Sequence, residues 1–181
     1  MNYISRIEKI IYNENSNYYR IYFSAKETRF SSYLNVPIPD AKNIALSREN
    51  INSNRLKTYN TFIDLISLLS IKIIKIIISK KKNKIISNIF LEFNNKEYKL
   101  TVNYVDAIII SIKTFSLLYL HKAFFISDNF SINENYKIDL DKNSKQSIEI
   151  SNLKNILKLL VQNEEYESAA LVRNKINKIL D

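Results

Sequence analysis

The segment 100–122, LTVNYVDAIIISIKTFSLLYLHK, constrains the fold more than any other part of the chain. A helix that opens at Asp106 is apolar at nearly every position in its middle, so it needs cover on several sides at once. Just before it, polar and apolar residues alternate as in a half-buried strand at 97–102. The apolar residues on one side of that strand are Tyr98, Leu100 and Val102. The segment therefore predicts a sheet with helices packed on it.

The remaining periodicities predict the other elements of this α+β domain. Expected strands are 3–12, 18–23, 29–36, 71–79, 85–93, 117–120 and, at the edge of the core, 124–126. Two further helices are expected, one from Asp40 as N-cap to about Glu49, the other from Thr58 as N-cap to Ser70. The buried stripe expected on the second is Phe62, Leu65, Ile66 and Leu69. The sheet should be mixed or mostly antiparallel, with two to three packed helices.

The chain contains neither glycine nor cysteine. Positions with positive φ must therefore fall mostly to Asn or Asp, and Asn94 and Asn95 are the clearest such pair. Lack of cysteine excludes disulfides, thiolate metal sites and cysteine nucleophiles, and lack of glycine excludes P-loop and dinucleotide fingerprints. The single histidine, His121, follows an apolar strand without an identified partner, which favours an ordinary structural or surface role over catalysis.

The character of the chain changes after Asp128. Residues 129–151 are polar and are expected to form a linker between a domain at 1–128 and a helical hairpin at 152–181. Apolar residues recur at helical spacing in both halves of the hairpin. They leave more apolar surface than two short helices can hide, which predicts either a partner, a second copy or docking on the chain's own domain.

The central segment resembles the core signature of the bifunctional-nuclease domain family. Asp106 and Ala107 match its Asp-Ala pair and 108–114 follows its helix, while the residues that match its two earlier motifs are Asp40, Ala41, Ile44, Ala45, Arg55, Thr58 and Phe62. The resemblance implies hydrolysis of DNA and RNA, with a divalent metal such as Mg²⁺ or Mn²⁺. The catalytic candidates carried over are Asp106, Arg55, Thr58 and Asp40, with Asp106 as the candidate metal ligand. Several polar motif positions depart from the family: Tyr59, Asn60, Thr101 and Asn103.

The C-terminal segment resembles the UVR motif, a two-helix hairpin of excision-repair proteins that is also appended to bacteroidete-type bifunctional nucleases. The residues in family order are Glu165, Tyr166, Glu167, Ala169, Ala170 and Arg173. Asn174 replaces the usual Asp. The resemblance implies a protein-binding element, with Tyr166, Glu167 and Arg173 as candidate contacts.

The formal net charge of +9 permits a nucleic-acid partner. The clearest basic cluster is Lys80, Lys81, Lys82 and Lys84, which could contact phosphates or form a solvated hairpin turn. Residues with A+T-rich codons are abundant, so the charge can also reflect mutational drift. The sequence shows no interleaving of aromatic and basic residues of the kind that stacks single-stranded bases. Charged residues break the longest apolar run, 63–78, and no targeting segment is evident, so we expect a cytoplasmic protein without a membrane span.

Two hypotheses stay open from the sequence alone. The first is a bifunctional-nuclease relative with an eroded site and weak or lost activity, which the retained Arg55 and Asp106 favour. The second is a non-catalytic dimerising scaffold whose hairpin recruits a repair or nucleic-acid-associated protein, which the motif losses favour. Asp106 itself can serve as a helix cap, as a structural partner of Arg55 or as a catalytic group.

Overall fold

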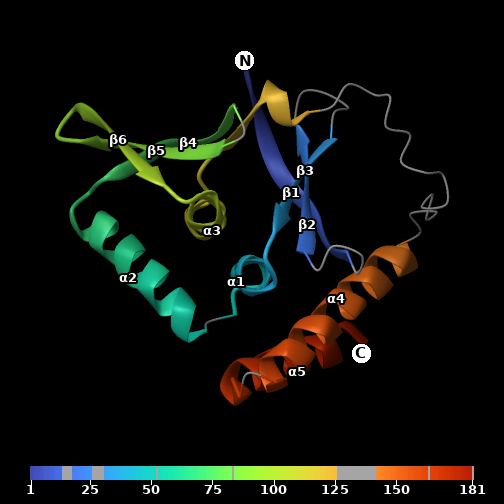
Figure 1. Cartoon of the computed structure of the whole chain (residues 1–181). Coiled ribbons are helices and arrows are strands. Elements are labelled where there is room, and N and C mark those ends of the chain that lie inside the picture. Colours follow the sequence, from blue (N-terminus) through green and yellow to red (C-terminus); the bar gives the residue numbers. More distant parts are fainter. Residues whose placement is uncertain are drawn as a thin grey trace. The chain divides into compact units, whose positions relative to one another are not determined.

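The computed structural model describes residues 1–13, 18–25, 31–51, 53–82, 84–125, 142–162 and 164–180 (Figure 1). The chain divides into two compact units, Met1–Ser127 and Asp128–Asp181. The first unit holds a seven-stranded sheet with its helices, and the second holds a two-helix hairpin. The expected α+β fold class with a C-terminal helical hairpin is confirmed.

The strands of the first unit form one mixed sheet in the order β3-β2-β1-β7-β4-β5-β6. Their bounds are β1 Asn2–Asn13, β2 Tyr18–Ala25, β3 Ser31–Val36, β4 Lys72–Lys81, β5 Lys84–Phe93, β6 Lys96–Val102 and β7 Leu118–His121. Neighbouring strands are antiparallel except β4 and β7, which pair in parallel. β7 therefore joins the N-terminal strands to the β4–β6 strands in the middle of the sheet.

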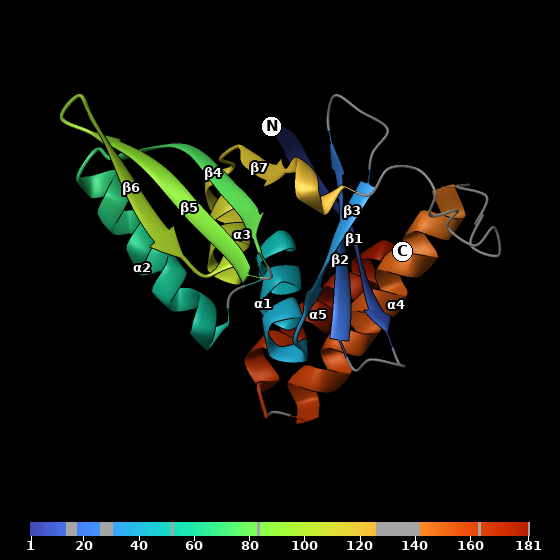
Figure 2. The same ribbon diagram turned by 45° about the horizontal axis from the view of Figure 1, so that its top comes forward.

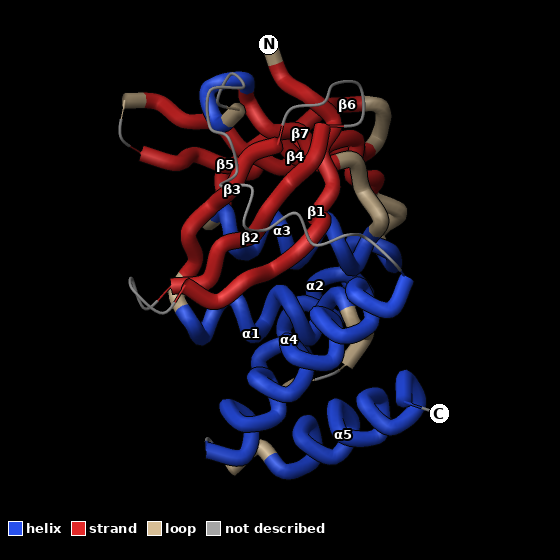
Figure 3. Tube along the Cα trace, turned by 90° about the vertical axis from the view of Figure 1, so that its right-hand side faces the viewer, coloured by secondary structure: helices blue, strands red, loops and turns tan. Residues whose placement is uncertain are grey.

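Three α-helices lie on one side of this sheet, as Figure 3 shows. They are α1 Ile38–Arg48, α2 Asn54–Leu68 and α3 Tyr104–Thr114, and a 3-10 turn, η1 Lys122–Phe124, follows β7. α3 contacts β4, β5, α1 and α2, so it has cover on several sides, as its apolar sequence requires (Figure 2). The core between the layers contains fully buried side chains from both: Ile21, Phe23, Ile44, Ile76, Ile78, Ile89, Ile108 and Leu120.

Three helix starts differ from those expected. α1 begins at Ile38 with Pro37 as its N-cap residue, so Asp40 lies in the first turn and is not the cap. Pro39 lies in the first turn, where proline is tolerated because the N–H that it lacks would have no partner within the helix. α2 begins at Asn54 with Ser53 at its N-cap position, which places Thr58 inside the helix.

α3 is capped by Asn103, whose side chain accepts a hydrogen bond from the backbone N–H of Val105. Asp106 therefore lies in the first turn of α3 and the cap role considered for it is wrong. A carboxylate there still benefits from the positive end of the helix dipole. The helix ends as expected at Phe115, which adopts the left-handed conformation with φ 54°.

Burial differs from expectation at the β6 edge and on α2. Tyr98 and Leu100 of β6 are 49% and 40% exposed, because β6 is the outermost strand of the sheet. Of the stripe expected on α2 only Ile66 is buried, whereas Leu65 and Leu69 are exposed. The strand expected at 124–126 is also wrong where it is described, since Phe124 closes η1; Ile126 lies outside the described residues.

The positive φ values expected at Asn94 and Asn95 are confirmed, and these residues form the turn between β5 and β6. Asn94 and Asn95 have φ values of 50° and 60°, and they connect Phe93 directly to its strand partner Lys96. Two consecutive left-handed residues define the hairpin turn that matches the twist of the strands. Asn serves here because it tolerates this conformation better than other residues with a side chain.

The second unit consists of α4 Lys142–Gln162 and α5 Tyr166–Leu180, which pack on each other. α4 begins inside the range 129–151 that was expected to be a linker, so that expectation is wrong from Lys142 onward. The buried residues of the two helices recur at helical spacing: Leu153, Ile156, Leu160, Ala169, Val172 and Ile176. No helix in the described part of the chain is long and apolar enough to cross a membrane.

Candidate functional site

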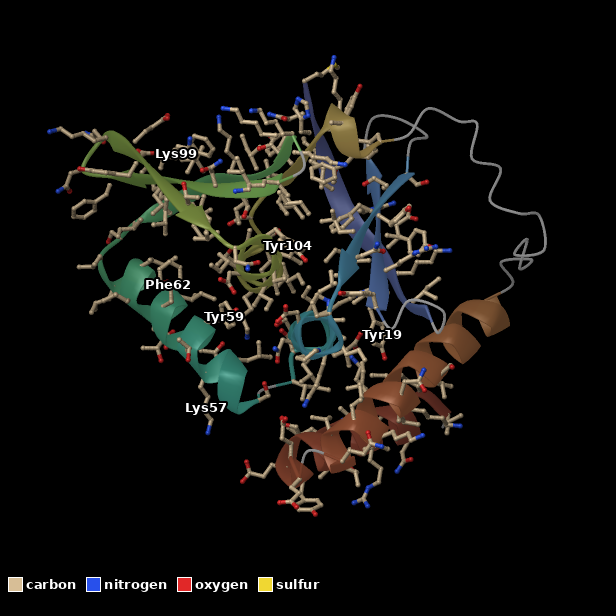
Figure 4. The ribbon with its side chains drawn as sticks, viewed as in Figure 1. Tyr19, Lys57, Tyr59, Phe62, Lys99 and Tyr104 are labelled. Atoms are coloured by element: carbon tan, nitrogen blue, oxygen red, sulfur yellow. The ribbon has the colours of Figure 1, made fainter. Side chains whose placement is uncertain are left out.

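Four polar side chains meet between α2 and α3, and we call this group the polar seam. The Tyr59 hydroxyl donates a hydrogen bond of 2.5 Å to Asp106 Oδ1, and Lys113 Nζ donates one of 2.8 Å to Asn60 Oδ1. Figure 4 shows Tyr59 between the two helices and Lys57 on the outer side of α2. Asp106 and Lys113 lie two helical turns apart on one side of α3, so both can contact α2.

Each half of the polar seam pairs a charged group of α3 with a neutral group of α2. Asp106 is half-buried, and the phenol of Tyr59 is its hydrogen-bond donor. Partial burial lowers the pKa of the Lys113 ammonium group, because burial disfavours its charged form. The seam can therefore hold α2 on α3 through two charge-assisted hydrogen bonds.

Asp40 lies near the opposite side of α3. The Tyr104 hydroxyl donates a hydrogen bond of 3.3 Å to the backbone carbonyl of Asn35. The pKa of Tyr104 is raised, mainly by burial and further by the nearby charges of Asp40 and Tyr18. Positions two apart on a helix face different directions, so Tyr104 and Asp106 are turned apart. Asp40 is thus associated with Tyr104 and not with the polar seam.

The other two catalytic candidates lie on α2. Thr58 is exposed, and the backbone of Arg55 lies in the first turn while its side chain falls outside the described part of the structure. The possible pairing of Arg55 with Asp106 therefore stays a prediction. Of the four candidates, the structure places only Asp106 in the polar seam, beside two residues at which the sequence departs from the family pattern, Tyr59 and Asn60. Lys113 was missed, although its spacing from Asp106 puts both on one helical side.

Among the described side chains, no group of three or more His, Cys, Asp or Glu residues is close enough to hold a metal ion. Asp106 contributes one carboxylate, and one of its oxygens accepts the hydrogen bond that the Tyr59 hydroxyl donates. Mg²⁺ usually keeps several of its waters and is bound by one or two carboxylates together with substrate phosphates. His121, in turn, has a local role, since its Nδ1 accepts a hydrogen bond from the backbone N–H of Ala123.

A second polar surface lies on the side of the sheet that faces away from α1, and we call it the cationic-aromatic face. Its members are Lys9, Arg20, Tyr22 and Tyr33. Lys9 Nζ lies 4.9 Å from the centre of the Tyr22 ring, and the Arg20 guanidinium lies 5.0 Å from that of Tyr33. The two ring centres are 6.0 Å apart. Three strands thus place alternating cations and aromatic rings side by side.

Strand register explains why these residues share one side. Along β2, Tyr19, Ile21 and Phe23 are buried against the helices, so the residues between them point the other way. Tyr22 pairs with Lys9 on β1 and with Tyr33 on β3, which continues the face across the strands. From the sequence, no interleaving of aromatic and basic residues was expected, and that expectation is wrong for this face, because the interleaving arises from the pairing of β2 with Lys9 on β1 and Tyr33 on β3.

The lysine cluster at the β4–β5 turn divides between the two sides of the sheet. Lys81 pairs with Lys84 across the turn, on the side of Lys75, whose ammonium lies 5.1 Å from the Phe90 ring centre. Lys80 points to the opposite side, and Lys82 lies in the turn with φ 54°. All four cluster residues are exposed. Lys81 and Lys84 thereby extend the positive charge along the same side of the sheet as the cationic-aromatic face.

In the second unit, the predicted partner-binding residues lie on α5. Tyr166 is 65% exposed, and Glu167 and Arg173 are exposed as well. The turn before α5 brings the backbone N–H of Glu165 to the carbonyl of Leu160. These three side chains are therefore accessible at the outer surface of the hairpin.

No protein-family model matches this chain, and no curated protein matches it at a significant level of sequence similarity.

Proposed function

We propose that the protein binds single-stranded nucleic acid on the cationic-aromatic face without cleaving it, as a non-catalytic relative of the bifunctional nucleases that its sequence resembles. The observation that carries the proposal is the pairing of Lys9 with Tyr22 and of Arg20 with Tyr33 on adjacent strands. Aromatic rings on an exposed sheet surface stack unpaired bases, and neighbouring cations contact the phosphates.

The exposure and charge of the face fit this ligand. Tyr33 is 41% exposed, so part of its side chain is accessible to a base, and the guanidinium of Arg20 lies over its ring. Lys9 and Arg6 are exposed on the same side, and Arg6 Nε donates a hydrogen bond to Ser24 Oγ that orients its guanidinium. The net charge of +9 adds a long-range attraction for polyanions.

Loss of catalysis is inferred from the polar seam. Tyr59 holds the only catalytic candidate in the seam, Asp106, in a structural hydrogen bond between two helices. The described side chains provide no cluster that would hold a metal beside it. The bond to Tyr59 gives Asp106 a structural role between the two helices, which supports the non-catalytic proposal.

The proposal is tested by fluorescence anisotropy with labelled single-stranded RNA, single-stranded DNA and duplex DNA at several salt concentrations. Tyr33→Ala should weaken single-strand binding by about five- to hundredfold, since stacking contributes roughly 1–3 kcal/mol per base. Lys9→Ala should reduce the salt slope by about one. Lys57→Ala is the matched control, because Lys57 is exposed on α2, away from the face. Unchanged binding by Tyr33→Ala would contradict the proposal.

A second candidate function is weak phosphodiester hydrolysis at the polar seam. The observation in its favour is that Asp106 and Lys113 lie on one side of α3, with a lowered pKa at Lys113. Incubation of labelled DNA and RNA with purified protein and Mg²⁺ or Mn²⁺ tests it. Cleavage that disappears in Asp106→Asn would establish a surviving nuclease and overturn the non-catalytic proposal. Absence of cleavage by folded protein is the expected result.

The α4–α5 hairpin is proposed to bind a repair or nucleic-acid-associated protein through Tyr166, Glu167 and Arg173. Their exposure on one short helix supports the proposal. Tyr166→Ala and Arg173→Ala should weaken such an association without changing nucleic-acid binding by the sheet. Equal loss of both activities would assign these residues to the nucleic-acid site instead.

A further inference from the structure

β6 forms one edge of the sheet and is exposed along almost its whole length. Among the described elements, β5 is the only one that β6 contacts extensively. Figure 2 shows β6 as the outermost strand of the sheet at this end. Such an edge presents a row of backbone N–H and C=O groups that can pair with another strand.

The hairpin turn determines which backbone groups point outward. Phe93 and Lys96 close a two-residue turn, and a closing pair of this kind exchanges both of its backbone hydrogen bonds. Bonded pairs then recur at every second residue of β6. The N–H and C=O groups that point away from β5 are therefore those of Glu97, Lys99 and Thr101.

We propose that two copies of this chain associate through their β6 edges as antiparallel strands, with Glu97 of each copy opposite Lys99 of the other. The sheet then continues from one copy into the next. This inference goes beyond nucleic-acid binding and does not depend on it, because it concerns the opposite end of the sheet from β3.

Charge selects this register over the adjacent one. Outward-pointing residues must face each other, so the neighbouring arrangement places Lys99 of one copy directly opposite Lys99 of the other. Like charges at directly opposite positions destabilise a strand pair, whereas opposite charges stabilise it. The proposed register contains the Glu97–Lys99 pair twice, once on each side of the two-fold axis.

The same register explains the exposed apolar residues of β6. Tyr98 of one copy lies opposite Tyr98 of the other, at a pair without mutual backbone hydrogen bonds, where side chains approach most closely. Cross-strand aromatic pairs at such positions stabilise antiparallel sheets. Tyr98 and Leu100, which are 49% and 40% exposed in one copy, would lose much of this exposure on association.

Analytical ultracentrifugation of the full chain over a range of concentrations tests the proposal, with circular dichroism as the check on folding. The expected result is a reversible dimer. Lys99→Glu and Glu97→Lys should each weaken dimerisation roughly tenfold, because each places two like-charge pairs in the interface. The double variant Glu97→Lys/Lys99→Glu restores both opposite-charge pairs and should recover the dimer. Lys57→Glu is the control, since it changes a surface charge away from β6.

A cross-linking experiment identifies the register directly. The chain has no cysteine, so a single introduced cysteine forms a disulfide only with its counterpart in another copy. Tyr98→Cys should cross-link on mild oxidation, because Cα atoms at such a pair are roughly 4.5 Å apart, within the range that a disulfide requires. Lys99→Cys should not cross-link, since its counterpart lies opposite Glu97.

Two outcomes would overturn the proposal. A chain that stays monomeric up to about 100 µM, well above typical affinities of specific complexes, would mean that Lys96 and Lys99 protect the edge instead of pairing it. A dimer that Lys99→Glu leaves unchanged and that Tyr98→Cys does not cross-link would place the interface elsewhere, for example on the α4–α5 hairpin.

Discussion

α3 and α2 are neighbouring helices that both carry apolar residues at helical spacing, and their surroundings differ. α3 is enclosed by β4, β5, α1 and α2, and its residues from Ala107 to Ser111 are all buried. α2 contacts mainly α1 and α3, and Leu68 on its outer side is 81% exposed. An apolar stripe therefore predicts burial only where other elements of the fold supply the cover. α2 lies at the margin of the helix layer, where that cover ends.

The largest expected effect is the difference in stability loss between a truncated buried residue of α3 and a truncated exposed residue of α2. Ile108→Ala should reduce the free energy of unfolding by about 2–5 kcal/mol, because Ile108 is fully buried and the substitution leaves a cavity. Leu68→Ala should change it by no more than about 0.5 kcal/mol, as is usual for exposed positions. Urea denaturation followed by circular dichroism measures both. A large loss in Leu68→Ala would mean that α2 is covered in solution, which would remove the contrast.

The next effect concerns the starts of the two helices. Asn103→Ala should cost about 1 kcal/mol, since its side chain caps α3 by accepting the Val105 N–H. Thr58→Ala should cost less than about 0.5 kcal/mol, because Thr58 lies inside α2 and is exposed. The same denaturation experiment applies. If Thr58→Ala proved the more costly variant, the start of α2 would have to be revised toward Thr58.

A smaller effect, of opposite sign, is expected just beyond the ends of both helices. Phe115 and Ser70 each have φ 54°, a conformation that glycine adopts at lower cost than any residue with a Cβ. Phe115→Gly and Ser70→Gly should each raise the free energy of unfolding by up to about 1 kcal/mol, after the greater freedom of glycine in the unfolded chain is subtracted. Thermal unfolding should show higher midpoints. Destabilisation by Phe115→Gly would instead indicate that its ring, although 88% exposed, makes a contact in solution.

The smallest expected effect is a pH dependence of stability that arises from Tyr104, the first residue of α3. Because the pKa of Tyr104 is raised in the folded chain, mainly by burial, folding favours its protonated form. The associated stability is fully present below the ordinary tyrosine pKa of about 10 and is lost as pH rises through the folded pKa. Tyr104→Phe should therefore show a shallower loss of stability above about pH 10 than the parent chain. Denaturation midpoints between pH 9 and pH 11 provide the measurement, and parallel curves would contradict the expectation.

The sequence predicts this fold well where local signals and tertiary context agree. The apolar run of α3, the alternating strands and the Asn94–Asn95 turn were all recognisable, because each depends on residues adjacent in the chain. Helix starts were less predictable, since Pro39 was interpreted as part of the end of a strand although proline is equally tolerated in the first turn of a helix. The exposure of β6 and of α2 depends on which elements lie beside them, and no local pattern contains that information.

The candidate sites were predictable to a smaller extent. Asp106 was singled out from the sequence, but its bond to Tyr59 depends on the approach of α2 to α3, which are separated by three strands in the chain. The interleaving of Tyr and Arg on the cationic-aromatic face was not recognised from the sequence. The pairing of β2 with Lys9 and Tyr33 required the register of two neighbouring strands. Sites assembled across elements are thus determined by topology as much as by composition.

The position of β7 has a consequence for how the chain is made. This four-residue strand lies between β1 and β4, and the backbone N–H of Lys122 donates to the carbonyl of Met1, so both ends of the sheet-forming region meet in its middle. During synthesis, β1 has no inner neighbour until Leu118 and the residues after it have left the ribosome. The edge of β1 that later pairs with β7 therefore stays unpaired until most of the chain has been synthesised. Nascent chains stalled before Leu118 should be the species most dependent on chaperones.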